Sequence, residues 1–224
     1  MAGTVRAIAK VEGRKEVSRV RYIGDVHGKY RRYSKVIKDV PESIQVGDMG
    51  VGFLSFPHGD PQANPPHDKM IPGHRFIRGN HDNPAACKSQ SQWIPDGTIE
   101  NGTMFIGGAD SIDKAYRIKD YSWWEDEELS YKALHEIIGL YEISKPKIMV
   151  THDAPQSIAH EVIRPLLMQG YSQFEMTRTR GAFQNMWAMH QPELWIFGHY
   201  HVSFDKVING TRFICLAELE YKDI

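Results

Sequence analysis

The stretch Val20-Arg21-Tyr22-Ile23-Gly24-Asp25-Val26-His27-Gly28 joins an apolar run to a polar cluster that follows it directly. The run Val20–Ile23 has the character of a short strand buried on both faces. Asp25 and His27 then lie at the carboxyl end of that strand, which is where α/β sheets bind ligands. The stretch therefore predicts an α/β fold with a ligand site after its first strand.

Four more polar clusters follow strand-like runs in the same way. The runs are Ser43–Val46, Arg75–Arg78, Lys147–Val150 and Glu193–Phe197, and the clusters are Gly47-Asp48, Gly79-Asn80-His81-Asp82, Thr151-His152 and Gly198-His199-Tyr200-His201. A single cluster would carry little weight, because a lone histidine is usually a core or surface residue. Five clusters at successive strand ends are expected to converge on one crevice.

The five clusters supply carboxylate, imidazole and amide groups and no thiolate. This mixture of nitrogen and oxygen donors suits Mn, Fe, Zn or Ni, and the lack of cysteine argues against a thiolate-rich structural zinc site. The pattern therefore indicates a centre for two divalent metal ions, with Mn²⁺ as the first expectation.

The order of these clusters resembles the calcineurin-like metallophosphoesterase superfamily, whose motifs are GD-x-HG, GD, GNH(D/E), (T/S)H and GH-x-H. The matching motifs span residues 24–201. The resemblance implies an α/β fold of two packed mixed β-sheets flanked by helices, a four-layer α/β/β/α sandwich. It implies these metal ligands: Asp25, His27 and His201 for one ion, Asn80, His152 and His199 for the other, and Asp48 as the bridge.

The resemblance also makes His81 the catalytic histidine beside the phosphate. Two divalent ions roughly 3.5–4 Å apart would polarise phosphoryl oxygens and lower the pKa of a shared water, which supplies hydroxide for in-line attack. His81 would protonate the leaving oxygen, because its unperturbed pKa of about 6.5 is close to physiological pH. Asp82 follows it directly and is expected to orient or charge the imidazole.

The expected substrate-binding residues are Arg78, Asn80 and Arg117. Arg78 matches the phosphoprotein-phosphatase branch and could bind phosphate as a bidentate donor, or it could be a surface arginine that ends a strand. That branch continues its second motif as GD-x-x-DRG, whereas this chain has Gly47-Asp48-Met49-Gly50-Val51-Gly52-Phe53. Protein phosphatase activity is therefore not favoured.

Two irregular segments, 52–74 and 107–125, are expected to shape specificity. The first contains five prolines, which suit an ordered rim or a plain connector. The second leaves the strand-like run Thr103–Ile106 and carries Arg117. Its Trp123 and Trp124 either anchor the loop to the core, which we favour, or stack on a base.

Apolar spacing predicts three helices, over Tyr30–Val40, Asp126–Ile143 and about Arg178–His190. Near the end of the chain, Asn209-Gly210 favours a type I′ turn and predicts a β-hairpin over about 202–217. Residues 1–224 are expected to form a single domain with its motif core at 20–204.

The 224 residues, 41% hydrophobic and 11% aromatic, suffice for one large domain. A formal net charge of −1 gives no overall field that would attract nucleic acid or an anionic membrane. Cys87 and Cys215 show no metal-like spacing and no disulfide framework. There is no signal-peptide pattern and no apolar run near the roughly 20 residues that span a bilayer, so we expect a cytoplasmic location.

The sequence favours a metal-dependent phosphoesterase acting on a small phosphorylated compound, a nucleotide or a cyclic nucleotide. A nuclease of the same superfamily is the alternative, and the neutral net charge weighs against it. A non-catalytic scaffold is disfavoured because all seven ligand positions and His81 carry competent residues. The sequence leaves open the preference for monoesters or diesters, the native metals and the oligomeric state.

Overall fold

The computed structural model describes residues 19–53, 72–167 and 176–224, and in these residues the strands form two mixed sheets. The four-stranded sheet has the order β10-β1-β2-β3, with β1 Arg21–Ile23, β2 Ser43–Gln45, β3 His74–Phe76 and β10 Tyr221–Asp223. The six-stranded sheet has the order β4-β5-β6-β7-β9-β8, with β4 Thr98–Glu100, β5 Thr103–Ile106, β6 Ile148–Thr151, β7 Leu194–Phe197, β8 Phe204–Ile208 and β9 Thr211–Cys215.

Each sheet has a parallel centre. Strands β1, β2 and β3 run parallel, as do β5, β6, β7 and β9, whereas β10, β4 and β8 pair antiparallel at edges. The side chains of β1, β2, β5 and β7 are buried throughout, as expected for parallel strands covered on both faces. This is why the strand-like runs in the sequence are continuous and not alternating.

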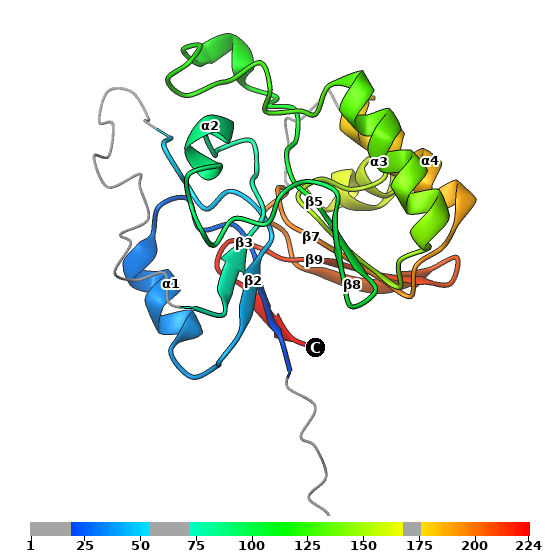
Figure 1. The fold of residues 1–224 in the computed structure, drawn as a ribbon, viewed down its shortest axis with the longest axis horizontal. Coiled ribbons are helices and arrows are strands. Elements are labelled where there is room, and N and C mark those ends of the chain that lie inside the picture. Colours follow the sequence, from blue (N-terminus) through cyan, green and yellow to red (C-terminus); the bar gives the residue numbers. More distant parts are fainter. Residues whose placement is uncertain (1–18, 54–71, 168–175) are drawn as a thin grey trace, which may run out of the picture.

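The helices lie on the outer faces of the two sheets (Figure 1). They are α1 Tyr30–Ile37, α2 Pro84–Cys87, α3 Tyr131–Ser144 and α4 Arg178–Met189, with the 3₁₀ turns Lys114–Tyr116 and Arg164–Leu166 and the π-helical turn Ile158–Ile163. Helices α1 and α2 lie beside the four-stranded sheet, and α3 and α4 lie beside the six-stranded sheet.

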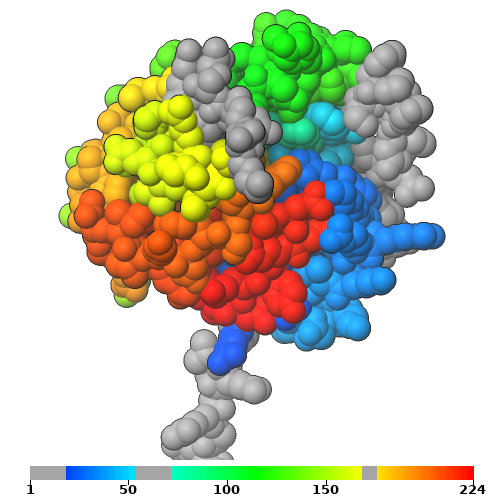
Figure 2. All heavy atoms as spheres, turned by 180° about the vertical axis from the view of Figure 1, so that it is seen from behind, coloured from blue at the N-terminus to red at the C-terminus, as the bar shows by residue number. Residues whose placement is uncertain are grey.

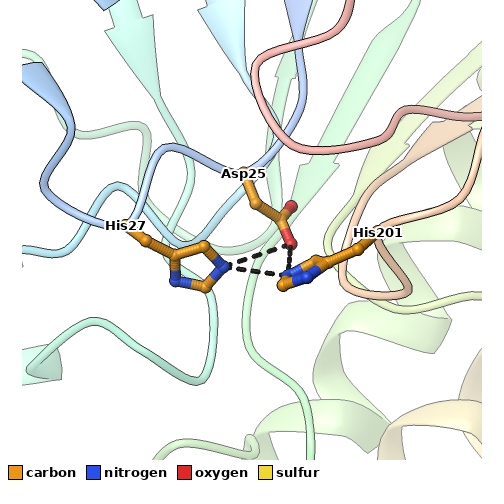
Figure 3. A group of neighbouring side chains, drawn as sticks. All are labelled: Asp25, His27 and His201. Atoms are coloured by element: carbon orange, nitrogen blue, oxygen red, sulfur yellow. Dashed lines mark hydrogen bonds and ion pairs between the residues drawn. The ribbon is translucent and has the colours of Figure 1, made fainter. Parts of the chain in front are cut away.

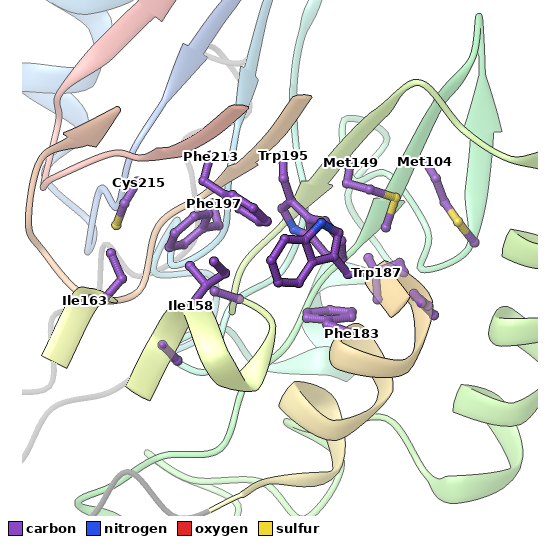
Figure 4. Packing of buried hydrophobic residues seen from close by; sticks show 14 of the residues in the cluster. Met104, Met149, Ile158, Ile163, Phe183, Trp187, Trp195, Phe197, Phe213 and Cys215 are labelled. Carbon is purple, nitrogen blue, oxygen red and sulfur yellow. The ribbon is translucent and has the colours of Figure 1, made fainter. Parts of the chain in front are cut away.

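Three apolar cores hold the layers together. Val46, Ile77 and Ile196 belong to the core between the two sheets. A second core packs α1 against the four-stranded sheet. The third packs Phe183 of α4 and the π-helical turn against Trp195 and its neighbours on the six-stranded sheet (Figure 4). The predicted four-layer α/β/β/α fold class is therefore confirmed.

The predicted helix over Asp126–Ile143 begins later than expected. The Oγ of Ser130 accepts a hydrogen bond from Ala133 N and caps the first turn, so α3 starts at Tyr131. Residues 125–128 form a turn and a bend instead. The first predicted helix is also shorter, since α1 ends at Ile37.

The predicted C-terminal hairpin is confirmed. Strands β8 and β9 pair antiparallel around Asn209 and Gly210, whose φ angles of 48° and 85° fit a type I′ turn. The sequence did not reveal β4 or β10, which are three residues long. Among the described residues no helix has both the length and the apolar character needed to cross a bilayer. Most of the predicted rim 52–74 lies outside the described residues.

Candidate metal centre

The motif residues occupy loops that leave the carboxyl ends of parallel strands. Asp25 follows β1, Asp48 follows β2 and Asn80 follows β3, all in the four-stranded sheet. His152 follows β6 and His199 follows β7 in the six-stranded sheet. The two sheets therefore bring their ligand-bearing loops to the same edge.

Asp25, His27 and His201 form the first cluster (Figure 3). The Nε2 atoms of His27 and His201 are 2.9 Å apart, and Asp25 Oδ2 lies 3.0 Å from His201 Nε2 and 3.8 Å from His27 Nε2. Two imidazole nitrogens and one carboxylate oxygen therefore converge on a common point, as the ligands of one cation do.

Asp48, His152 and His199 form the second cluster. His152 Nε2 lies 3.3 Å from Asp48 Oδ1 and 3.1 Å from Asn80 Oδ1. The other oxygen of Asp48, Oδ2, lies 3.8 Å from His27 Nε2 in the first cluster. The two oxygens of Asp48 thus face different clusters, which is the geometry expected of a bridging carboxylate.

Three features show that these residues fit metal ions. Asp25 Oδ2 is buried and accepts no hydrogen bond of acceptable geometry. Four ligand residues adopt left-handed backbone angles that cost roughly 1–3 kcal/mol each and cluster at functional sites; they are His27, Asp48, His199 and His201, with φ between 47° and 68°. A Cβ at Gly79 or Gly198 would clash with the carboxylate of Asp48 or Asp25, so these turns accommodate the ligands closely.

The electrostatics also suit a cation. Burial lowers the pKa of His199 to about 4, so its imidazole is neutral at pH 7. Burial opposes the charge of His152, yet the Asp48 carboxylate raises the pKa of His152 to about 10. Burial opposes ionisation of Asp48 too, but the surrounding histidines hold its pKa well below its usual range. A cation between them would replace the proton of His152, as is usual when metals bind histidine.

His81 lies beside both clusters, with ring nitrogens within reach of His27 and Asp48. Its ring stacks on Phe53 with centroids 4.6 Å apart, and its Nε2 lies 2.6 Å from Arg117 Nη2. Burial lowers the pKa of His81 to about 4. The structure therefore places Arg117 at the site, as predicted, against the imidazole expected to act as the acid.

Arg78 does not point into the site, which contradicts both predicted alternatives. Arg78 is 3% exposed, and its Nε donates to Asp96 at 2.8 Å. Its Nη1 donates to the backbone carbonyls of Asp126 and Glu127. Arg78 is thus a structural residue that ties β3 to the turn before α3, not a phosphate ligand.

Asp82 does not contact His81, and this expectation was also wrong. Its carboxylate accepts hydrogen bonds from four backbone N–H groups, those of Met49, Gly50, Val51 and Gly79. It therefore holds together the two loops that carry Asp48 and Asn80. Asp153, next to His152, pairs with Arg180 at 3.0 Å and accepts from the Tyr200 hydroxyl.

The sequence did not single out three residues that complete the surroundings of the site. Phe53 stacks on His81. Ser111 accepts hydrogen bonds from Asn80 and Arg117 and donates to Glu127. Glu127 falls within the predicted helix Asp126–Ile143, although Ser130 is a candidate N-cap that would place Glu127 outside that helix.

A cavity of about 520 Å³ opens at the centre. Its walls combine ligands, basic side chains and apolar side chains, including Asp48, Asn80, His81, Arg117, Arg180, His199, His201, Ile112, Leu166, Leu167 and Val202. Such a volume is typical of sites for small molecules. Trp124 is buried, as expected of a loop anchor, with its ring centroid 6.2 Å from that of Phe53.

The calcineurin-like phosphoesterase family matches residues 18–203, so the chain belongs to this family. Family membership and the clustered ligands support metal-dependent phosphoester hydrolysis as its general activity. No curated protein matches the chain.

The solved structures that are similar to this chain include the following two. One, GAP50, the anchor in the inner membrane complex of Plasmodium, is 12% identical, with 89% of this chain and 72% of that chain covered and a TM-score of 0.48. The other, the phosphopantetheinyl hydrolase PptH from Mycobacterium tuberculosis, is also 12% identical, with 92% and 95% covered and a TM-score of 0.48.

Proposed function

We propose that this protein hydrolyses phosphate esters of small molecules, such as a phosphorylated metabolite, a nucleotide or a cyclic nucleotide. The observation that carries the proposal is the clustering of the seven ligand residues beside a cavity of about 520 Å³, which His81 and Arg117 line together with four of the ligands, Asp48, Asn80, His199 and His201. Nucleic acid is a less favoured substrate, because the net charge of the chain is −1. The two buried free thiols, Cys87 and Cys215, accord with a cytoplasmic location.

Asp25, His27 and His201 would hold one divalent ion, Asn80, His152 and His199 the other, and Asp48 would contact both. Bound there, two such ions, Mn²⁺ in our proposal, polarise phosphoryl oxygens and make a water nucleophilic near neutral pH.

The protein's own residues then bind the phosphate and move a proton. Arg117 donates to His81 Nε2, so this nitrogen carries no proton while the contact lasts. A phosphate oxygen is a better acceptor for a guanidinium than a neutral imidazole is. We infer that an arriving phosphate takes Arg117 Nη2, whose charge contributes to the low pKa of His81, and so frees His81 Nε2 to take up a proton from water and give it to the leaving oxygen.

The test is Mn²⁺-dependent hydrolysis of p-nitrophenyl phosphate, phenyl phosphate and bis(p-nitrophenyl) phosphate by the wild type, His81→Ala and Asp48→Asn. His135→Ala is the matched control, because His135 is exposed on α3. We expect Asp48→Asn to lose Mn²⁺ and turnover. His81→Ala should keep Mn²⁺ and lose about 10²–10⁴-fold in kcat.

In His81→Ala, kcat should fall further for phenyl phosphate than for p-nitrophenyl phosphate, because the poorer leaving group of phenyl phosphate depends more on a general acid. Equal losses would exclude the acid role of His81. Turnover of oligonucleotides that falls steeply with salt, together with inert small esters, would favour the nuclease alternative. Absence of any turnover with Mn²⁺ bound would contradict the proposed function.

A further inference from the structure

The hydroxyl of Ser111 is the junction between a metal ligand and the arginine beside His81. Ser111 is fully buried, and its Oγ accepts from Asn80 Nδ2 at 3.0 Å and from Arg117 Nη1 at 2.9 Å. The same Oγ donates to Glu127 Oε2 at 2.7 Å. A hydroxyl offers one donor and two acceptor positions, so the hydrogen-bonding capacity of Ser111 is fully used.

Glu127 fixes Ser111 in this position from outside the cavity. Its second oxygen, Oε1, accepts from the backbone N of Ser111 at 2.7 Å, so the carboxylate binds both the main chain and the side chain of the serine. Glu127 is only 2% exposed and lies in the turn before α3. Its backbone carbonyl also accepts from buried Arg78, which ties this turn to β3.

The two donors that meet at Ser111 face the centre with their other atoms. Because the Nδ2 of Asn80 is committed to Ser111, its Oδ1 is directed to His152 Nε2, 3.1 Å away, where the second cluster lies. The Nη1 of Arg117 is committed as well, and its Nη2 lies within reach of both His81 Nε2 and, at 2.7 Å, Asp113 Oδ1. One hydroxyl therefore helps to orient both groups, and Asp113 is a second partner of the arginine.

We infer that Ser111 and Glu127 are positioning residues that couple the metal ligand Asn80 to the phosphate-binding arginine Arg117. The part of this inference that concerns Arg117 rests on the proposed function, because it requires that Arg117 bind phosphate. The part that concerns Asn80 requires only metal binding. It requires that loss of the Ser111 hydroxyl weaken two separate properties of the site, metal affinity through Asn80 and phosphate affinity through Arg117.

The test compares Ser111→Ala, Arg117→Met and the double variant with the wild type. Calorimetric titration with Mn²⁺ alone gives metal affinity, and inhibition by inorganic phosphate, with KM and kcat for p-nitrophenyl phosphate, gives phosphate affinity. The matched control is Ser157→Ala, because Ser157 also donates through both its backbone N and its Oγ to one side chain, Gln184, away from the centre.

We expect Ser111→Ala to weaken Mn²⁺ binding about 10-fold or more, the usual effect of removing a partner of a metal ligand. It should also raise KM and the inhibition constant of phosphate about 10-fold. Arg117→Met should raise these two constants similarly and leave Mn²⁺ affinity unchanged. The double variant should have no higher KM than Arg117→Met alone, because Ser111 acts on phosphate only through that arginine.

The inference is overturned if Ser111→Ala binds Mn²⁺ and phosphate as Ser157→Ala does, or if the effects of Ser111→Ala and Arg117→Met on KM multiply. If Ser111→Ala loses its native circular dichroism, Glu127→Gln replaces it in the same measurements. Glutamine keeps the volume of the glutamate side chain and one of its two acceptor oxygens. A wild type that binds Mn²⁺ and hydrolyses no ester would defeat the proposed function alone, since Mn²⁺ titration still tests the link from Ser111 to Asn80.

Discussion

Glu127 carries its carboxylate where burial disfavours the charge. Burial raises the pKa of Glu127 to about 7, although hydrogen bonds from Ser111 oppose the shift. A carboxyl group whose pKa is higher in the folded than in the unfolded chain favours folding at low pH. That contribution is complete below about pH 4.5, the ordinary value, and is lost as the pH rises through about 7.

Glu127→Gln should remove this pH dependence. Between pH 4.5 and pH 8, the free energy of unfolding of the wild type should fall by about 3 kcal/mol relative to that of the variant. Urea denaturation at a series of pH values measures the difference. Parallel curves for the two proteins would show that Glu127 titrates normally. In that case Glu127 would hold Ser111 without destabilising the protein. The expected result instead means that Glu127 holds Ser111 and lowers the stability of the protein at neutral pH.

At the scale of elements, the turns after the strands depend on glycine where a ligand side chain packs on the backbone. A Cβ at Gly198, directly after β7, would clash with Asp25 Oδ1. We expect Gly198→Ala to displace Asp25 and to weaken Mn²⁺ binding at least 10-fold, measured by calorimetric titration.

A second glycine gives the control for this substitution. Gly139 lies within α3, and a Cβ there would meet no atom within 4 Å. Gly139→Ala should therefore leave Mn²⁺ affinity unchanged and stabilise the protein by roughly 0.5–1 kcal/mol, because alanine favours the helix. If Gly198→Ala binds Mn²⁺ as tightly as Gly139→Ala, the close approach of Gly198 to Asp25 has no role in the site.

The strands and the ligand clusters could be predicted because their signals are local. An apolar run followed at once by Gly and Asp, as at Ile23 to Asp25, specifies both the strand and the place of the ligand. The partner of Arg78 is Asp96, 18 residues further along the chain, and no local pattern links the two. For the same reason the role of Glu127 was hidden, because its partner Ser111 lies 16 residues before it.

At the scale of the molecule, the C-terminal segment crosses from one sheet to the other. After β9 the chain leaves the six-stranded sheet and ends as β10 against β1 in the four-stranded sheet. On the way, Leu219 N donates to the carbonyl of Asp25, and Gly24 N donates to the carbonyl of Glu220. Figure 2 shows these C-terminal residues (red) between the blue and orange parts of the surface. The residues just before β10, a short strand that the sequence did not reveal, thus brace the first ligand loop.

The candidate centre joins the two sheets a second time, since Asp25, His27, Asp48 and Asn80 come from the four-stranded sheet and His152, His199 and His201 from the six-stranded one. Metal ions held by both sheets bind the folded chain in preference to the unfolded one and must stabilise it by mass action. At a free Mn²⁺ concentration of 100 times the dissociation constant the gain is about 2.7 kcal/mol. For a chain of this length that raises Tm by roughly 5–10 °C.

Differential scanning calorimetry of the wild type in EDTA and in Mn²⁺ measures this rise in Tm, with Asp48→Asn and His135→Ala as the variants. His135→Ala should show the full rise, because its side chain is exposed on α3. Asp48→Asn should show little of it, because the substitution removes the carboxylate that faces both clusters. An equal rise in Tm for Asp48→Asn would mean that Mn²⁺ stabilises the protein from another site. The claim that metal ions at this centre link the two sheets would then be wrong.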